Sequence, residues 1–169
     1  MRKEVIGNCE IYLGDYRDAL QEAGQIDLIV ADPPYGTRAA SAGGLKARVA
    51  RDYDPKVRAH VWPEIIGDTG PFDPSVLLST CENIILWGAN NFASRLPDSA
   101  CWLAWDKKCG KAAASKIGDG ELAFVRGLPC QAGRVCRHMC ACFRRESEVG
   151  DKHLHASQKP VALMEWCLG

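Results

Sequence analysis

The sequence predicts an α/β domain in which a mixed, mostly parallel sheet is flanked by helices. Residues 26–31 form an apolar run rich in β-branched residues, which is typical of a buried parallel strand. Short runs of this kind alternate with amphipathic helical segments along the chain, as they do in α/β proteins. With 169 residues, 47% of them hydrophobic, the chain is long enough for one domain and its core.

The first part of the chain predicts a strand pair, a helix and the main strand, in that order. The strand pair lies within residues 3–14, and the helix runs from Tyr16 to Ala23 and ends at Gly24. The main strand occupies residues 26–31. Residues 37–72 are dominated by glycine, alanine and charges without a sustained period, which predicts a mobile loop.

The rest of the chain continues the alternation of helices and strands. A helix is expected over 73–81, with Asp73 as its cap and Pro74 in its first turn. A last helix begins at Pro160, in its first turn, with Ser157 as its cap. Between these helices the sequence predicts a short helix after Asn90 and four strands, near 83–88, 101–105, 121–125 and 134–143.

The most informative segment is Asp32-Pro33-Pro34-Tyr35, which follows the main strand directly. Ligands of open α/β sheets bind outside the carboxyl ends of strands, where Asp32 is expected. The two prolines stiffen the loop and leave carbonyls without neighbouring N–H donors. Asp32 and the Pro33 carbonyl can accept both N–H bonds of an exocyclic base amine, and Tyr35 can stack on the base. A base inside a duplex must be flipped out to reach such a loop.

This segment resembles the Asp-Pro-Pro-Tyr motif of the amino-group DNA methyltransferases. The resemblance implies an S-adenosylmethionine-dependent enzyme with an incomplete Rossmann-like methyltransferase fold. It also implies that Asp32, Pro33, Pro34 and Tyr35 are catalytic, and that Asp32 borders the cofactor. An aspartate in the first position accompanies mostly adenine N6 targets in this family, so adenine in DNA is the expected substrate.

A second segment narrows the resemblance to the circularly permuted, β-type members of the family. His155-Ala156-Ser157-Gln158-Lys159-Pro160 is similar to their His-Pro-Thr-Gln-Lys-Pro element, with Ala156 and Ser157 as the departures. In the family this element lines the cofactor pocket, and an aspartate after the first strand pair lies near the adenine of the cofactor. The resemblance therefore implies a cofactor site with these members: Asp15, Asp32, His155, Ser157, Gln158 and Lys159.

Three weaker matches follow the family's order, and one expected element is missing. Residues 84–92, 102–107 and 120–124 are similar to successive strands of the family. The family's later Phe-x-Gly-x-Gly loop and ribose-binding acid do not occur in this sequence. We therefore interpret residues 1–169 as one carboxyl-terminally truncated methyltransferase domain. It is expected to bind S-adenosylmethionine weakly or not at all, and to be inactive as an isolated chain.

Other functions stay open at this point. A catalytically dead DNA-binding remnant is one alternative, because the glycine loop is missing and Ala156 departs from the family pattern. A fragment of an N4-cytosine methyltransferase is another, and a structural fragment without a function of its own is the third. The truncation is also expected to leave a strand edge unpaired, which favours association into a homodimer or larger aggregates.

The charge distribution is the only electrostatic hint of a DNA partner, because 21 basic residues balance 21 acidic ones. Basic residues are concentrated in two stretches, 38–58 and 126–145, where they can bind phosphates or simply face solvent. The candidates for DNA contacts are Arg38, Lys46, Arg48, Arg51, Arg144 and Arg145, and the same stretches contain Lys56, Arg58, Arg126, Arg134 and Arg137.

The nine cysteines are scattered among apolar neighbours and are interpreted as reduced thiols. The chain has no apolar run that could span a bilayer and no hydrophobic signal core at its amino terminus, so we expect a cytoplasmic protein without a membrane partner. Cys136-x-His138-x-Cys140-x-Cys142 is too dense for the usual pairs of zinc ligands, and alternation along a strand explains it equally well. No metal site is predicted.

Overall fold

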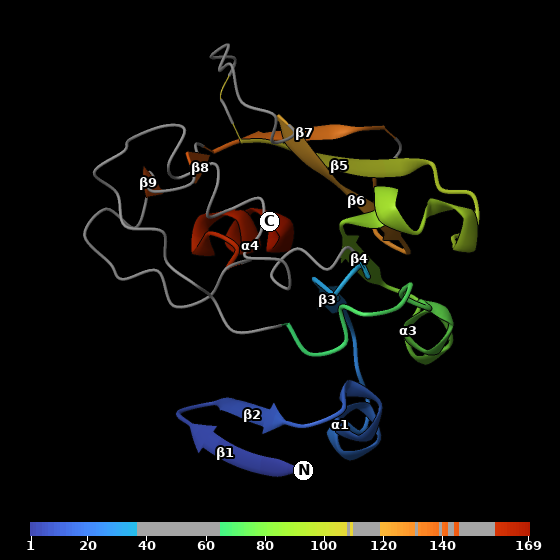
Figure 1. Ribbon diagram of the computed structural model, residues 1–169, viewed down its shortest axis with the longest axis vertical. Helices are drawn as coiled ribbons and strands as arrows, with labels where there is room; N and C mark the ends of the chain where they lie inside the picture. Colours follow the sequence, from blue (N-terminus) through green and yellow to red (C-terminus); the bar gives the residue numbers. More distant parts are fainter. Residues whose placement is uncertain are drawn as a thin grey trace.

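A computed structural model of the protein describes residues 1–36, 65–107, 109, 119–130, 132–138 and 158–169, and the backbone alone of 140–141 and 144–145. Its centre is a five-stranded sheet (Figure 1). In chain order the strands are β3 (Ile29–Ala31), β4 (Ile84–Trp87), β5 (Cys101–Asp106), β6 (Gly120–Arg126) and β7 (Arg134–Arg137).

The spatial order of the strands is β3-β4-β6-β5-β7. β3 is parallel to β4, β5 is parallel to β7, and β6 is antiparallel to both of its neighbours. Four of these five strands therefore point the same way, and the sheet is mixed, with two parallel and two antiparallel pairs. Because of this direction, β3, β4, β5 and β7 all end at one edge of the sheet, where β6 begins.

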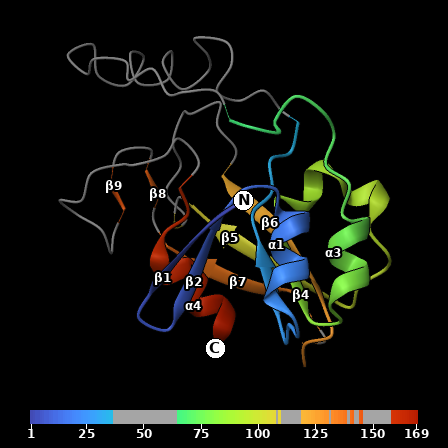
Figure 2. The ribbon, with the colours of Figure 1, turned by 90° about the horizontal axis from the view of Figure 1, so that it is seen from below.

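The two faces of the sheet carry separate halves of the core. On one face, α1 (Tyr16–Ala23) and α3 (Ser75–Thr80) lie side by side, and a cluster around Leu86 and Phe124 is buried there (Figures 1 and 2). On the other face, α4 (Val161–Leu168) inserts Leu163 beside Trp87 and Trp105. Alternate residues of β4 and β6 thus supply both clusters, which is why these central strands are almost uniformly apolar.

The remaining elements are short. β1 (Arg2–Ile6) and β2 (Cys9–Leu13) form the antiparallel pair that was predicted, and it joins no other described strand. Two 3₁₀ turns, η1 (Ala89–Asn91) and η2 (Ala93–Arg95), follow β4 where the short helix was predicted. A small hairpin consists of β8 (Cys140–Ala141) and β9 (Arg144–Arg145).

Several predicted boundaries need correction. The main strand is shorter than 26–31, and among the described strands it pairs with β4 alone, so Val30 and Ala31 are only half-buried. The strand predicted over 134–143 ends at Arg137 because the backbone then enters the β8–β9 hairpin. Pro74 and Pro160 occupy the cap positions of their helices rather than the first turns.

The segment predicted to be a mobile loop, 37–72, is described only from residue 65. Within that part the packing is uneven, because Ile66 is exposed, and the mobility of the segment stays a prediction. Asp68 is buried, and the ring of Phe72 lies edge-on to that of Phe92 with 5.2 Å between centroids. A segment without hydrophobic periodicity can therefore still be packed through a few aromatic contacts, which the pattern of apolar residues in the sequence does not reveal.

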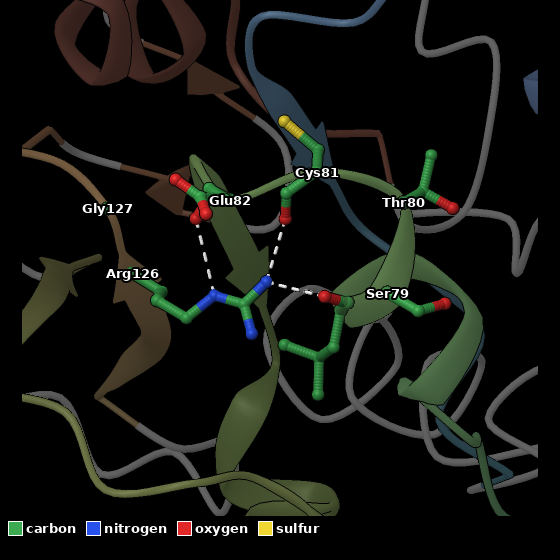
Figure 3. Close-up of a pocket in the computed structure, with 7 residues that line it drawn as sticks. Ser79, Thr80, Cys81, Glu82, Arg126 and Gly127 are labelled. Carbon is green, nitrogen blue, oxygen red and sulfur yellow. Dashed lines mark hydrogen bonds between the residues drawn. The ribbon is translucent and has the colours of Figure 1, made fainter.

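Arg126 is half-buried and donates hydrogen bonds to the backbone near the end of α3. It lines a surface hollow at the end of α3, together with residues 78–82 and Gly127 (Figure 3). Its guanidinium donates hydrogen bonds to the carbonyl oxygens of Leu78 at 2.6 Å, Cys81 at 2.7 Å and Glu82 at 3.3 Å. These carbonyls belong to the end of α3, where helical acceptors have no backbone partner. A contact between Arg126 and phosphates stays a prediction.

Replacing Arg126 by leucine is expected to lower the free energy of unfolding by about 1–3 kcal/mol, because carbonyls that now accept hydrogen bonds would lose their donor. Urea unfolding monitored by tryptophan fluorescence measures the change. Arg137→Leu is the matched control, because the side chain of Arg137 is 73% exposed and its Nε lies 4.0 Å from Asp106 Oδ2. Equal losses in the two variants would contradict the structural role of Arg126.

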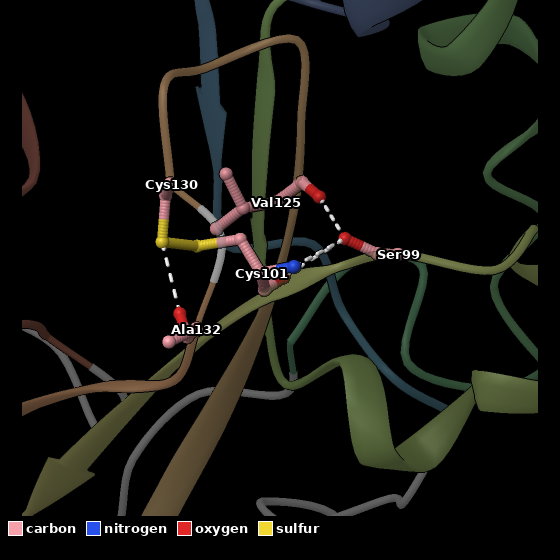
Figure 4. The surroundings of a disulfide bond; sticks show 5 residues. All are labelled: Ser99, Cys101, Val125, Cys130 and Ala132. Carbon is pink, nitrogen blue, oxygen red and sulfur yellow. Dashed lines mark hydrogen bonds between the residues drawn. A yellow bond between two sulfur atoms is a disulfide. The ribbon is translucent and has the colours of Figure 1, made fainter.

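Cys101 and Cys130 form a disulfide, with 5.4 Å between their Cα atoms (Figure 4). The interpretation of all nine cysteines as reduced thiols is therefore wrong for this pair. The cause is tertiary: Cys101 opens β5, which pairs with β6, and the chain turns back after β6 to place Cys130 beside it.

No helix among the described residues has the length and apolar character needed to cross a membrane.

Candidate functional site

The edge at which the parallel strands end gathers side chains from four parts of the chain. Asp32 and Tyr35 follow β3, Lys107 follows β5, Glu121 lies at the start of the antiparallel β6, and Lys159 precedes α4. This is the edge where ligands of open α/β sheets bind. We refer to Asp32, Tyr35, Lys107, Glu121 and Lys159 as the edge cluster.

Lys159 joins the two segments that carried the sequence resemblance. Its Nζ donates to Asp32 Oδ1 at 2.8 Å, across 127 positions of sequence. It also lies 2.7 Å from Glu121 Oε1 and 3.4 Å from the hydroxyl of Tyr35. The Lys159 side chain is only 11% exposed, so the ammonium is largely enclosed by these three oxygen atoms.

Glu121 contacts three other members of the edge cluster. Its Oε2 accepts from Lys107 Nζ at 2.6 Å, and its Oε1 accepts from the Tyr35 hydroxyl at 2.8 Å and contacts Lys159. Burial by itself would raise the pKa of Glu121, but the charges of Lys159 and Lys107 outweigh it and lower that pKa to about 2. Glu121 is therefore a carboxylate at neutral pH, and the two lysines balance its charge and that of Asp32.

Tyr35 has a protonated hydroxyl and a fixed ring. Burial, followed by the negative charges of Glu121 and Asp32, raises the pKa of Tyr35 far above its ordinary value. The hydroxyl has one proton to donate, and both Asp32 Oδ1 and Glu121 Oε1 lie within hydrogen-bond distance of it. The ring lies against Gly88, where an added Cβ would come within 2.0 Å of Tyr35 Cζ, and a positive φ of 71° also suits glycine there.

The loop that carries Asp32 and Tyr35 is anchored at its far end. Gly36 has a φ of +76°, and a Cβ at this position would lie 2.3 Å from the carbonyl oxygen of Gly70. The Asp-Pro-Pro-Tyr loop therefore rests against the described residues 65–72. Together with the prolines this close approach holds Asp32 at the strand end, as the sequence predicted.

The structure brings together only part of the expected cofactor site. Asp32 and Lys159 meet, and Gln158 is half-buried next to Lys159. Asp15 instead caps α1 and accepts hydrogen bonds from Arg17, which lower the pKa of Asp15 to about 2. Among the described residues, the hydrogen bonds to the Asp15 carboxylate all come from Arg17, so none of them brings Asp15 to Asp32 or Lys159. His155 and Ser157 lie outside the described residues.

The predicted DNA contacts cannot be placed against this edge. Arg38, Lys46, Arg48 and Arg51 lie outside the described residues, and Arg144 and Arg145 are described by their backbone alone. Of the other basic residues in the second stretch, Arg134 stacks over the ring of Trp166 at 5.0 Å.

The side chains of Cys140 and Cys142 also lie outside the part of the chain that the structure describes. Among the described residues, no group of three or more potential ligands is suited to a metal ion.

Sequence reasoning missed two members of the edge cluster. Lys107 and Glu121 fell within segments noted only as weak family matches. A signal was present, because Glu121 is the one charged residue of the strand predicted over 121–125. A buried carboxylate in an apolar strand requires a charged or hydrogen-bonding partner, so this pattern indicates that Glu121 interacts with other polar side chains.

Comparison with known proteins adds no constraint. The chain matches no protein family model, no curated protein and no solved structure. The function must therefore be argued from the edge cluster. The edge cluster consists of two carboxylates, a phenol hydroxyl and two ammonium groups, and its net charge is zero. This arrangement is suited to accepting N–H hydrogen bonds from a neutral ligand.

Proposed function

We propose that this chain carries the base side of the active site of a DNA methyltransferase that transfers a methyl group from S-adenosylmethionine to the exocyclic amine (N6) of adenine. One observation supports this most directly. The loop with Asp32 and the segment with Lys159, each of which resembles an element of the amino-group DNA methyltransferases, meet at the carboxyl edge of the sheet through a contact of 2.8 Å.

The proposed roles follow from the geometry of the loop. Asp32 accepts an N–H bond of the target amine, and the Pro33 carbonyl is proposed to accept the second. Tyr35 flanks the base, with its hydroxyl tied to Asp32 and Glu121. When both N–H groups of the amine donate hydrogen bonds to these acceptors, the lone pair of its nitrogen becomes available to the methyl carbon.

Methyl transfer is tested with the chain joined at Gly169 to the strand and glycine-rich loop of a β-type enzyme. Tritiated S-adenosylmethionine and unmethylated duplex DNA should give label in N6-methyladenine. Asp32→Asn should lower the rate roughly 100-fold or more, since it removes a charged group aimed at the reacting amine. Asp27→Asn, at an exposed position before β3, is the matched control.

Each outcome of this assay has a defined meaning. Full activity in Asp32→Asn would remove the catalytic assignment, and no label from the joined protein would contradict the proposed activity. Label in N4-methylcytosine would keep transfer to an exocyclic amine but correct the base. Tyr35→Phe is expected to be milder than Tyr35→Ala, because base–aromatic stacking, worth roughly 1–3 kcal/mol, survives without the hydroxyl.

A further inference from the structure

The ammonium of Lys159 has the contacts that the target amine would need. It donates to Asp32 Oδ1, the oxygen that also accepts from the Tyr35 hydroxyl. A carboxylate oxygen has room for about two donors, so Lys159 and Tyr35 together occupy Oδ1, one of the two oxygens of Asp32. An exocyclic amine that approaches Oδ1 of Asp32 therefore competes with Lys159.

We propose that the Lys159 ammonium occupies the position at Oδ1 of Asp32 that the target amine would take. A neutral exocyclic amine binds Asp32 by displacing this ammonium, which remains on Glu121. This inference rests on the proposed function and adds a regulation of its site. Glu121 Oε1 is 2.7 Å from Lys159 Nζ, so the lysine keeps a charged partner after it leaves Asp32. Lys107, on the opposite oxygen of Glu121, holds that carboxylate in place at 2.6 Å.

Charge balance decides which ligands fit. Asp32 and Glu121 carry two negative charges, and Lys107 and Lys159 carry two positive ones. A neutral amine that takes the place of Lys159 on Asp32 leaves this balance unchanged as long as Lys159 stays on Glu121. A cationic amine would add a charge in a partly buried position, which is unfavourable. The site is therefore suited to the weakly basic amine of a nucleobase and not to an alkylammonium.

The test compares adenosine with purine riboside, which differ only in the 6-amino group. Their affinities for the intact 169-residue chain are measured at pH 8 by nuclear magnetic resonance titration, and the ratio isolates the contribution of the amine. Lys159→Met keeps a side chain of similar length but removes the competing ammonium. We expect it to raise the preference for adenosine roughly tenfold, the lower range for one charge-assisted hydrogen bond.

Two further variants separate displacement from a general loss of charge. Lys159→Arg retains a cation on Asp32 and should keep the low preference of the wild-type chain. Lys107→Met removes a cation from Glu121 but leaves Lys159 on Asp32, so it should not raise the preference. Thermal unfolding of each variant confirms that the comparison is made on folded protein, and a Lys159→Gln variant replaces Lys159→Met if the latter does not fold.

The outcomes distinguish this inference from the function on which it rests. If adenosine is preferred over purine riboside but Lys159→Met leaves that preference unchanged, displacement is wrong and the amine site stands. If Lys107→Met raises the preference as much as Lys159→Met, the effect is one of net charge, and displacement is again wrong. If no variant distinguishes the two nucleosides, the recognition of an exocyclic amine fails, and the proposed function fails with it.

Discussion

Gly88→Ala should destabilise the protein and disconnect Tyr35 from Asp32 and Glu121. The new methyl group would lie within 2.0 Å of Tyr35 Cζ and 2.4 Å of its hydroxyl oxygen, so the ring must move. Strain at a φ of +71° is expected to cost about 1–2 kcal/mol, and the overpacked contact another ~1–3 kcal/mol. Urea unfolding of the variant measures the total.

Gly7→Ala separates the two contributions, because Gly7 has a φ of +60° but nothing within 4 Å of an added Cβ. Only the loss beyond that of Gly7→Ala reports the collision with Tyr35. A second comparison is made in a Tyr35→Ala background, where Gly88→Ala should cost no more than Gly7→Ala. If Gly88→Ala and Gly7→Ala cost the same in the wild-type background, Tyr35 does not occupy the position described.

The second large effect is expected at Glu121, as a dependence of stability on pH. Its pKa falls from an ordinary 4.5 to about 2 in the folded protein, which corresponds to about 3 kcal/mol of stability at neutral pH. Because the folded pKa is the lower one, this contribution is complete above about pH 5 and is lost as the pH falls towards 2. Glu121→Gln should lack it at every pH.

Urea unfolding of both proteins at a series of pH values tests this expectation. At pH 7 the variant should be less stable by up to about 3 kcal/mol, and the two curves should converge near pH 2. Glu165→Gln, at an exposed position of α4, is the matched control and should follow the wild-type curve. A constant difference between Glu121→Gln and wild type from pH 7 to pH 2 would show that the loss is one of packing and not of ionic pairing.

Local chemistry was sufficient to predict much of the secondary structure. The helix from Tyr16 to Ala23 follows from its cap at Asp15 and its apolar spacing, and β4, β5 and β6 follow from runs of apolar residues. The position of Asp32 directly after a strand follows from the residues on either side of it. All of these features depend on neighbours within a few positions, which a sequence displays directly.

Other features depend on contacts between distant segments, and only the tertiary structure decided them. The insertion of β6 between β4 and β5 places Glu121 beside Lys107, and the packing of α4 brings Lys159 to Asp32. Cys101 is paired with Cys130 for the same reason. Periodicity specifies which face of an element is buried but not which element covers it. The sequence alone thus determined the elements and the Asp-Pro-Pro-Tyr loop, while the pairing of charges around that loop was set by strand order and helix packing.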